Sequence, residues 1–175
     1  EKTLVLELAS NDGYLLSEFR QAGIPVLGVE PASNVAHMAI DKGVPTKIEF
    51  FGEQVAQNIL EEYGTPALII ANNVYAHIPD MIDFTRGLAV LCGTNTKISI
   101  ENPSFMTLLE KGYFDTIYHE HYSYLTATSV SRVAENCGLK LSDVEQLPTH
   151  GGSNRYWLSR SDVINASVPD LISQE

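Results

Sequence analysis

Short apolar runs alternate with amphipathic stretches along most of this chain. The runs Thr3–Leu8, Val26–Val29 and Ala67–Ala71 are rich in aliphatic residues, which is typical of strands buried on both faces of a parallel sheet. The stretches between them have helical spacing, and two of them stop at Gly23 and Gly64. Alternation of this kind indicates successive βαβ units.

The pattern predicts seven strands and six helices. The predicted strands are Thr3–Leu8, Val26–Val29, Pro45–Glu49, Ala67–Ala71, Lys97–Glu101, Leu139–Val144 and Asn154–Ser159. The predicted helices are Tyr14–Ala22, Ser33–Lys42, Gly52–Tyr63, Asp80–Leu91, Phe105–Gly112 and Ala127–Cys137, with Ser33 as the expected N-cap of the second. Repeated βα units followed by a closing hairpin predict an α/β fold: a Rossmann-like, doubly wound, seven-stranded, mostly parallel sheet with one antiparallel strand.

The ends of the chain suggest its domain limits. Residues 1–160 are expected to form one cofactor-binding domain, a length that suits a single core. Residues 161–175 are polar and are expected to be a linker or the start of a C-terminal element. We expect the chain to be a fragment of a longer protein.

Charge and cysteine content narrow the possible partners. The net charge is −11, which argues against a nucleic-acid surface and against electrostatic attachment to an anionic membrane. The two cysteines, Cys92 and Cys137, have no metal-ligand spacing, and they favour a cytoplasmic protein with free thiols.

The first strand runs into a turn and then a helix, an arrangement that places backbone N–H groups above the sheet. The turn carries Glu7, Ala9, Asn11 and Gly13, and it lacks the G-x-G-x-x-G pattern of dinucleotide sites. A carboxylate at the strand end repels phosphates and tolerates a cationic cofactor, which points to S-adenosylmethionine. Glu30 follows the second strand, where an acidic side chain can hold two ribose hydroxyls, although a solvated carboxylate is the alternative.

A cluster of titratable residues lies in the second half of the chain. Residues 117–122 read Ile-Tyr-His-Glu-His-Tyr, and so many polar groups suit a site that moves protons better than a core. His119 and His121 could instead ligate a metal if the segment were extended, or the segment could be a structural loop. The metalloprotease pattern H-E-x-x-H fails because position 123 is serine.

Four segments together resemble the nucleotide-sugar C-methyltransferases, a family of class I methyltransferases that makes branched-chain deoxysugars. The segments are Leu-Glu-Leu-Ala-Ser-Asn-Asp-Gly-Tyr-Leu-Leu at 6–16, Ala-Asn-Asn-Val-Tyr-Ala-His-Ile-Pro-Asp at 71–80, Phe-Asp-Thr-Ile-Tyr-His-Glu-His-Tyr-Ser at 114–123 and Pro-Thr-His-Gly-Gly-Ser at 148–153. Family members usually have glycine at the position of Ala9. They also carry a zinc domain before this fold and another domain after it, both of which help to bind the sugar nucleotide.

The resemblance implies a cofactor, a substrate and a set of site residues. The cofactor would be S-adenosylmethionine, leaving as S-adenosylhomocysteine, and the partner would be a nucleotide-diphosphate keto-sugar. The implied cofactor residues are Glu7, Ala9, Asn11, Gly13, Glu30, Pro31, Phe51 with its neighbour Phe50, Asn72 and Asn73. Phe50 and Phe51 could equally belong to the core.

Methyl transfer to carbon requires removal of a proton beside a ketone, and histidine is a suitable base near neutral pH. His121 is the expected base, with Glu120 orienting it or contacting the sugar. Tyr118 and His77 are expected to bind or polarise the keto oxygen, although His77, just before Pro79, could merely close a turn. A cofactor-binding module with another small-metabolite acceptor, or with no activity as this fragment, and a nicotinamide dehydrogenase are the alternatives.

Overall fold

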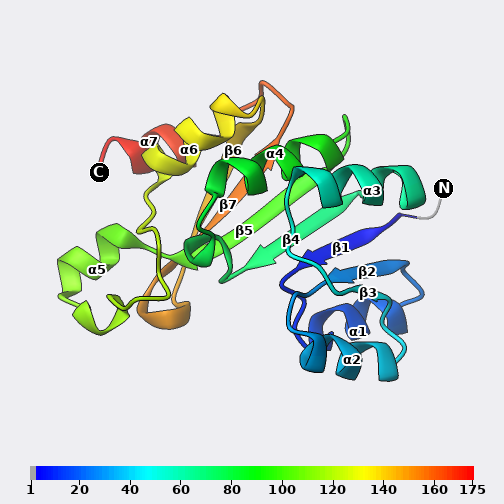
Figure 1. Cartoon of the computed structure of the whole chain (residues 1–175). Helices are drawn as coiled ribbons and strands as arrows, with labels where there is room; N and C mark the ends of the chain where they lie inside the picture. Colours follow the sequence, from blue (N-terminus) through cyan, green and yellow to red (C-terminus); the bar gives the residue numbers. More distant parts are fainter. Residues whose placement is uncertain (1–2) are drawn as a thin grey trace.

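The structure, a computed structural model, describes residues 3–175 and shows one seven-stranded sheet between two layers of helices (Figure 1). The strands are β1 (Val5–Leu8), β2 (Val26–Val29), β3 (Thr46–Lys47), β4 (Leu68–Asn72), β5 (Lys97–Pro103), β6 (Lys140–Leu147) and β7 (Ser153–Ser159). Their order across the sheet is β3-β2-β1-β4-β5-β7-β6. β7 runs antiparallel to both of its neighbours, and the other pairs are parallel. The α/β fold predicted from the sequence, with one reversed strand, is confirmed.

The helices divide between the two faces of the sheet. They are α1 (Tyr14–Gln21), α2 (Ser33–Asp41), α3 (Glu53–Tyr63), α4 (Met81–Leu91), α5 (Phe105–Lys111), α6 (Ala127–Asn136) and α7 (Ser167–Ile172), with 3₁₀ turns η1 (Tyr75–His77), η2 (Phe114–Thr116) and η3 (Thr149–Gly151). Helices α3, α4 and α6 cover the larger apolar core, whereas α1 and α2 cover a smaller one on the opposite face. α5 projects from the end of the sheet (Figure 1).

The strand order fixes where a ligand can bind. From β1 the chain adds β2 and β3 on one side, and β4 and β5 then lie on the other side. The loops that leave β1 and β4 therefore diverge to opposite faces, and a crevice opens at their carboxyl ends. The loops that follow β1, β2, β4 and β5 all begin at this one end of the sheet, because these strands are parallel.

Two local predictions are wrong in detail. Ser33 is the first residue of α2, and Ala32 is its N-cap with no side-chain hydrogen bond. The Glu30 carboxylate explains the shift, because its Oε1 accepts from the Ala32 backbone N–H at 2.9 Å and fixes the chain one residue before the helix. β3 is only two residues long, since it is an edge strand that pairs with β2 alone.

Residues after 160 pack on the domain through α7. Val168 and Leu171 are buried against the larger core. The Asp143 carboxylate on β6 accepts from the Ser167 hydroxyl and the Asn165 amide, and these bonds lower the pKa of Asp143. The domain boundary at residue 160 stays a prediction.

Within the described residues, no helix is both long and apolar enough to cross a membrane.

Candidate active site

The turn between β1 and α1 is built from left-handed backbone. Ala9 (φ 54°), Asn11 (φ 53°) and Gly13 (φ 74°) all adopt positive φ within five residues. Gly13 is required for a second reason, because a Cβ there would lie 3.0 Å from the Cβ of Ala39. Alanine is strained in this conformation, whereas asparagine tolerates it better, and Oδ1 of Asn11 accepts from the Asp12 N–H. The strain is held at the carboxyl end of β1, where the strand order predicts a ligand.

Glu30 joins this turn to the start of α2. Its Oε2 accepts from the Asn11 N–H at 3.0 Å, and its Oε1 accepts from the Ala32 N–H. Glu30 is 8% exposed, so the solvated-carboxylate alternative does not describe it. Each carboxylate oxygen accepts more than one hydrogen bond, which leaves Glu30 able to accept from a pair of ribose hydroxyls.

Glu7 is a buried carboxyl group with an unsatisfied oxygen. It is 3% exposed, and its Oε2 has no hydrogen-bond partner in the described chain. Burial raises the pKa of Glu7 from 4.5 to about 8. The free protein therefore holds Glu7 largely protonated at neutral pH, and a cation placed beside it would favour the carboxylate form.

An apolar pocket of about 210 Å³ lies between the ends of β1 and β2 and the segment after β4. Its lining residues are Ala9, Val29, Pro31, Glu49, Phe50, Phe51, Val74, His77, Ile78, Pro79 and Phe84. Phe51 packs edge-on against Phe84 with ring centroids 5.1 Å apart, whereas Phe50 is 84% exposed. Phe51 thus belongs to the core and to the pocket wall, and Phe50 belongs to the pocket alone. The size and aromatic lining suit a planar base.

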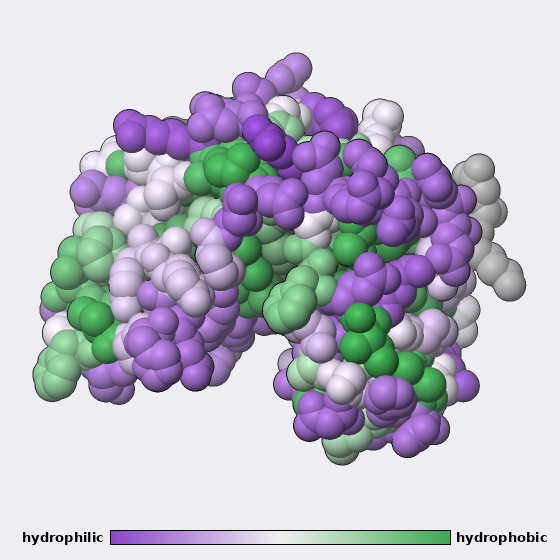
Figure 2. Space-filling view, viewed as in Figure 1, coloured by the Kyte–Doolittle hydropathy of each residue, from purple (hydrophilic) through white to green (hydrophobic). Residues whose placement is uncertain are grey.

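A second, polar pocket of about 180 Å³ lies beyond the ends of β4 and β5. Its lining residues are Asn73, Ala76, His77, Asn102, Pro103, Asp115, Thr116, Tyr118, His121 and His150. His77 lines both pockets. Figure 2 shows the surface hollowed between the part that contains α5 and the part that contains α1 and α2. The two pockets meet at η1, as a cofactor and an acceptor that react with each other must.

Hydrogen bonds assign the tautomer of His121. Its Nδ1 is 2.8 Å from the carbonyl oxygen of Thr116, and its Nε2 is 3.1 Å from the hydroxyl of Tyr118. A carbonyl only accepts, so Nδ1 carries the hydrogen and Nε2 of the neutral ring carries the lone pair. His121 therefore presents a basic nitrogen on the wall of the polar pocket, with Tyr118 donating to it.

His77 is fixed in the same way. Its Nδ1 donates to the carbonyl oxygen of Glu120 at 3.0 Å, and its ring centroid is 4.6 Å from that of His121. The neutral ring again leaves Nε2 as an acceptor, so His77 could donate to a keto oxygen only as the imidazolium ion.

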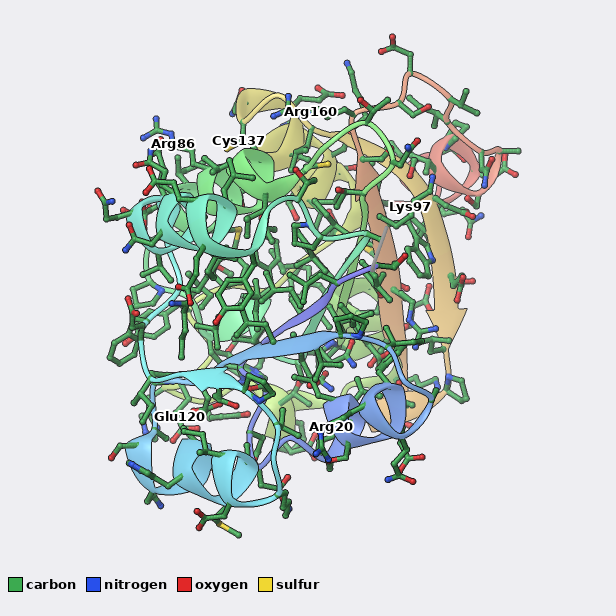
Figure 3. All side chains as sticks on the ribbon, turned by 90° about the vertical axis from the view of Figure 1, so that its right-hand side faces the viewer. Arg20, Arg86, Lys97, Glu120, Cys137 and Arg160 are labelled. Atoms are coloured by element: carbon green, nitrogen blue, oxygen red, sulfur yellow. The ribbon has the colours of Figure 1, made fainter. Side chains whose placement is uncertain are left out.

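The carboxylate of Glu120 makes no bond to His121; the Thr116 carbonyl orients that ring instead. Glu120 is 64% exposed at its side chain, with Oε1 3.8 Å from Nε2 of the 90% exposed His119. Figure 3 shows Glu120 near the end toward which β2 and β3 point and Lys97, at the start of β5, at the opposite end. Glu120 therefore lies at the correct end of the sheet, and its backbone carbonyl is the part that holds His77.

The two consecutive asparagines at the end of β4 occupy different positions. Asn72 ends the strand, whereas Asn73 follows it with φ 53° and lines the polar pocket. Nδ2 of Asn73 lies 3.4 Å from Nε2 of His150, which also has positive φ, and Oδ1 of Asn73 is buried without a partner.

Sequence reasoning assigned no role to three polar residues that line the polar pocket, Asn102, Asp115 and Thr116. Asn102 is 1% exposed near the end of β5, and a polar residue at the carboxyl end of a buried strand is a signal that could have found it. Thr116 acts through its backbone carbonyl, for which the residue type gives no signal.

The guanidinium group of Arg155 is engaged within the sheet. Arg155 on β7 pairs with Glu101 at 2.9 Å and with Glu145 at 3.3 Å, so two carboxylates already neutralise it. Across residues 3–175, no cluster of three or more His, Cys, Asp or Glu side chains is arranged to hold a metal ion.

Comparison with known proteins agrees with this geometry. Residues 2–144 match the family model described as a methyltransferase domain. The chain is 39% identical over 150 residues to the "C-methyltransferase NovU" of Streptomyces niveus, covering 86% of this chain and 36% of that protein. It thus spans just over a third of that relative's length.

Solved structures match the fold at lower identity. Magnesium protoporphyrin IX methyltransferase (ChlM) from Synechocystis PCC 6803 with bound SAH has a TM-score of 0.65 at 18% identity, over 91% of this chain and 74% of that one. A SAM-dependent methyltransferase from Anabaena variabilis ATCC 29413 has a TM-score of 0.67 at 14% identity, over 91% and 77% of the two chains.

The strand order and the site at the carboxyl ends of β1 and β4 define a class I methyltransferase domain, whose cofactor is S-adenosylmethionine. This chain belongs to the methyltransferase-domain family. The unsatisfied carboxyl of Glu7 fits that cofactor, because S-adenosylmethionine carries a cationic amine and a sulfonium.

Proposed function

We propose that this chain is the catalytic domain of an S-adenosylmethionine-dependent C-methyltransferase, which methylates the carbon beside the ketone of a nucleotide-linked deoxysugar in the cytoplasm. The observation that carries the proposal is the lone pair of His121 Nε2, held on a polar pocket that adjoins the apolar pocket at His77. The 39% identity to a protein named as a C-methyltransferase supports transfer to carbon. The four sequence segments that resemble the sugar-nucleotide family support the acceptor class.

The cofactor side would hold S-adenosylmethionine through groups that the turn already presents. Glu30 would accept from the ribose hydroxyls, and Glu7 would face the cationic methionine part as a carboxylate. Phe50, Phe51 and Pro31 would enclose the base in the apolar pocket. When bound, the cofactor supplies an electrophilic methyl group.

The acceptor side would make the carbon nucleophilic. Nε2 of His121 takes the proton from the carbon beside the ketone, and the C–H electron pair becomes the C=C bond of an enolate whose negative charge lies on the former keto oxygen. Tyr118 would turn its hydroxyl from His121 to that oxygen, and protonated His77 would be a second donor. Donors aimed at developing negative charge supply a large part of the rate enhancement in such reactions.

Proton exchange tests this proposal without requiring methyl transfer. The chain is incubated in D₂O with S-adenosylhomocysteine and a nucleoside diphosphate 4-keto-6-deoxyhexose, and deuterium incorporation beside the ketone is followed by NMR. His121→Asn should lower the exchange rate by about 10²- to 10⁴-fold while leaving S-adenosylhomocysteine affinity unchanged in calorimetry. His119→Asn is the matched control, since that exposed ring lies two residues away.

Exchange at the wild-type rate in His121→Asn would show that His121 is not the base. If the chain exchanged the α-proton of another ketone but not that of the sugar nucleotide, the proposed reaction would stand and the proposed acceptor class would be rejected. Binding of NADH in place of S-adenosylhomocysteine would reject the cofactor site.

A further inference from the structure

Asn102 is the most deeply buried polar side chain of the polar pocket and has no partner. It is 1% exposed near the end of β5, and neither Nδ2 nor Oδ1 makes a hydrogen bond within the described chain. A buried amide in this state costs free energy, and such groups are rare in folded proteins. The sequence resemblance assigned it no role.

The cross-strand neighbour of Asn102 shows that the position does not force this isolation. Asn154 on β7 is paired with Asn102 in the sheet and is 2% exposed. Its Nδ2 donates to the hydroxyl of Tyr156 at 3.2 Å. Two adjacent buried asparagines therefore differ in one respect: Asn154 is satisfied by the protein, whereas Asn102 lines the polar pocket and is not.

The position of Asn102 indicates that its ligand is the acceptor and not the cofactor. Asn102 lies on β5, two strands from β1 in the sheet order, whereas Glu7 and the strained turn belong to β1. It lines the pocket that contains His121 and Tyr118, and it is absent from the lining of the apolar pocket. A ligand group that pairs with it is therefore on the molecule that His121 deprotonates.

The chemistry of an amide defines that group further. Asn102 offers one N–H₂ donor and one carbonyl acceptor side by side. A keto oxygen can only accept, and a hydroxyl can donate, so an α-hydroxyketone matches both halves of the amide at once. Nδ2 would donate to the keto oxygen and gain strength as the enolate forms, while Oδ1 would accept from the neighbouring hydroxyl.

We propose that Asn102 binds the acceptor directly, and that the acceptor is an α-hydroxyketone whose keto oxygen and adjacent hydroxyl pair with the Asn102 amide. This inference rests on the proposed function and adds the arrangement of oxygen atoms around the reacting carbon. Asn73, whose Oδ1 is also buried and unpartnered in the same pocket, adds a further acceptor for the polyhydroxyl ring.

Stability and exchange measured together test the role of Asn102. Asn102→Leu has a similar shape and removes the unpaired polar atoms, so its melting temperature should rise by about 2 °C or more. Its kcat/KM for proton exchange in the 4-keto-6-deoxyhexose nucleotide should fall by about 10²-fold, as for loss of one donor to an oxyanion. A purely structural residue would change the melting temperature and leave the exchange rate alone.

Asn154→Leu is the matched control. It leaves the Tyr156 hydroxyl without its partner, so its melting temperature should fall while exchange per folded molecule stays within about twofold of wild type. A second test needs no variant. The analogue of the 4-keto-6-deoxyhexose nucleotide that lacks the hydroxyl beside the ketone should exchange with a kcat/KM about tenfold or more below that of the 4-keto-6-deoxyhexose nucleotide itself.

The outcomes separate this inference from the proposed function. The role of Asn102 is overturned if Asn102→Leu exchanges as fast as the wild type, or if the wild type exchanges the two probes at equal rates. Either result leaves His121 as the base. If the wild type exchanges neither probe, both the role of Asn102 and the proposed function are overturned. If Asn102→Leu does not fold, the comparison of the two probes still decides.

Discussion

The proposed cofactor and acceptor sides of the site are built in opposite ways. On the cofactor side, Glu7, Ser10 and Glu30 are buried at strand ends, and backbone N–H groups already occupy part of the Glu30 carboxylate. On the acceptor side, the segment between α5 and α6 exposes its apolar side chains, with Phe114 at 79% and Tyr122 at 63%. The first side is fixed by the sheet, whereas the second is a loop laid over its end (Figure 1).

This difference separates two tasks of the domain. A cofactor that is the same for a whole family can be recognised by strand ends and backbone geometry, which change little with sequence. An acceptor that differs between enzymes is better recognised by side chains on a loop, where substitutions cost little stability. The acceptor pocket nonetheless includes two residues at the end of the sheet. Asn73 follows β4, and Asn102 lies near the end of β5.

The largest effect is the pH dependence caused by Glu7. Its pKa is about 8 in the folded chain against 4.5 without burial, so between these values the unfolded chain has lost a proton that the native chain keeps. Rising pH therefore favours unfolding, by up to about 5 kcal/mol by pH 8 for this group alone. Glu7→Gln cannot ionise, and its stability advantage over wild type should be small near pH 4.5 and largest near pH 8.

Urea unfolding at several pH values measures this difference. Glu61→Gln, on the exposed side of α3, is the control and should follow the wild type. A Glu7→Gln advantage that does not change with pH would mean that Glu7 is already ionised in the free protein, and the contrast between a prepared cofactor side and an exposed acceptor side would weaken.

Glu30→Ala should reduce cofactor affinity more than any change on the acceptor loop. Removal of the carboxylate takes away the bonds that hold Asn11 and Ala32 and, under the proposed function, the contact with the ribose. Hydrogen bonds to a charged group contribute about 1.5–3 kcal/mol, so S-adenosylhomocysteine should bind about 10- to 100-fold more weakly in calorimetry. Glu30→Gln, which keeps an acceptor, should lie between the two; unchanged affinity in Glu30→Ala would remove Glu30 from the site.

Tyr118→Phe should affect rate and leave stability unchanged. Its hydroxyl contacts Nε2 of His121 at 3.1 Å, and its ring is 42% exposed. Loss of the proposed donor to the developing oxyanion predicts an exchange rate about 10²-fold lower. The melting temperature should change little, because the ring stays in place and is partly exposed. Tyr122→Phe, on a ring that is 63% exposed, should match the wild type. An equal loss in both variants would indicate a general effect on the loop.

The smallest effect concerns the strain at Ala9. A φ of 54° is unfavourable for alanine and acceptable for glycine. Ala9→Gly should raise the free energy of unfolding by about 0.5–1 kcal/mol, the relieved strain less the entropy that glycine loses on folding. Ala36→Gly, inside α2, should lower it by about 0.5–1 kcal/mol. Destabilisation by both changes would mean that the turn imposes no strain on Ala9.

Most of the architecture could be predicted because it depends on local pattern. The apolar runs of β1, β2, β4 and β5, and the glycines that stop helices, determine the elements within one or two residues. The elements that differ most are β3, shortened because it is an edge, β6, which continues to Leu147 where the prediction stopped at Val144, and α7, which was not predicted as a helix. The N-cap of α2 moves from Ser33 to Ala32 because a hydrogen bond to Glu30 from outside the helix fixes the chain there. Non-local contacts of that kind leave no mark on periodicity.

The candidate site divides in the same way. Residue type and place in the predicted elements selected Glu7, Glu30 and His121 as candidates, and their roles stay predictions. The orientation of those groups could not be predicted: a backbone carbonyl of Thr116 chooses the His121 tautomer, Glu120 contributes its carbonyl in place of its carboxylate, and Asn102 comes from a strand that looked purely structural.

Strand and helix patterns and residue chemistry are properties of short segments, so the class of fold and the kinds of group at the carboxyl-terminal edge of the sheet could be predicted from the sequence. Which of those groups share a pocket, and in which protonation or tautomeric state, follows only from the folded arrangement. Those properties depend on burial and on hydrogen-bond partners from distant parts of the chain. Glu7 shows the reason most directly: it is an ordinary glutamate in the sequence, and the sheet and helices packed around it raise its pKa to about 8.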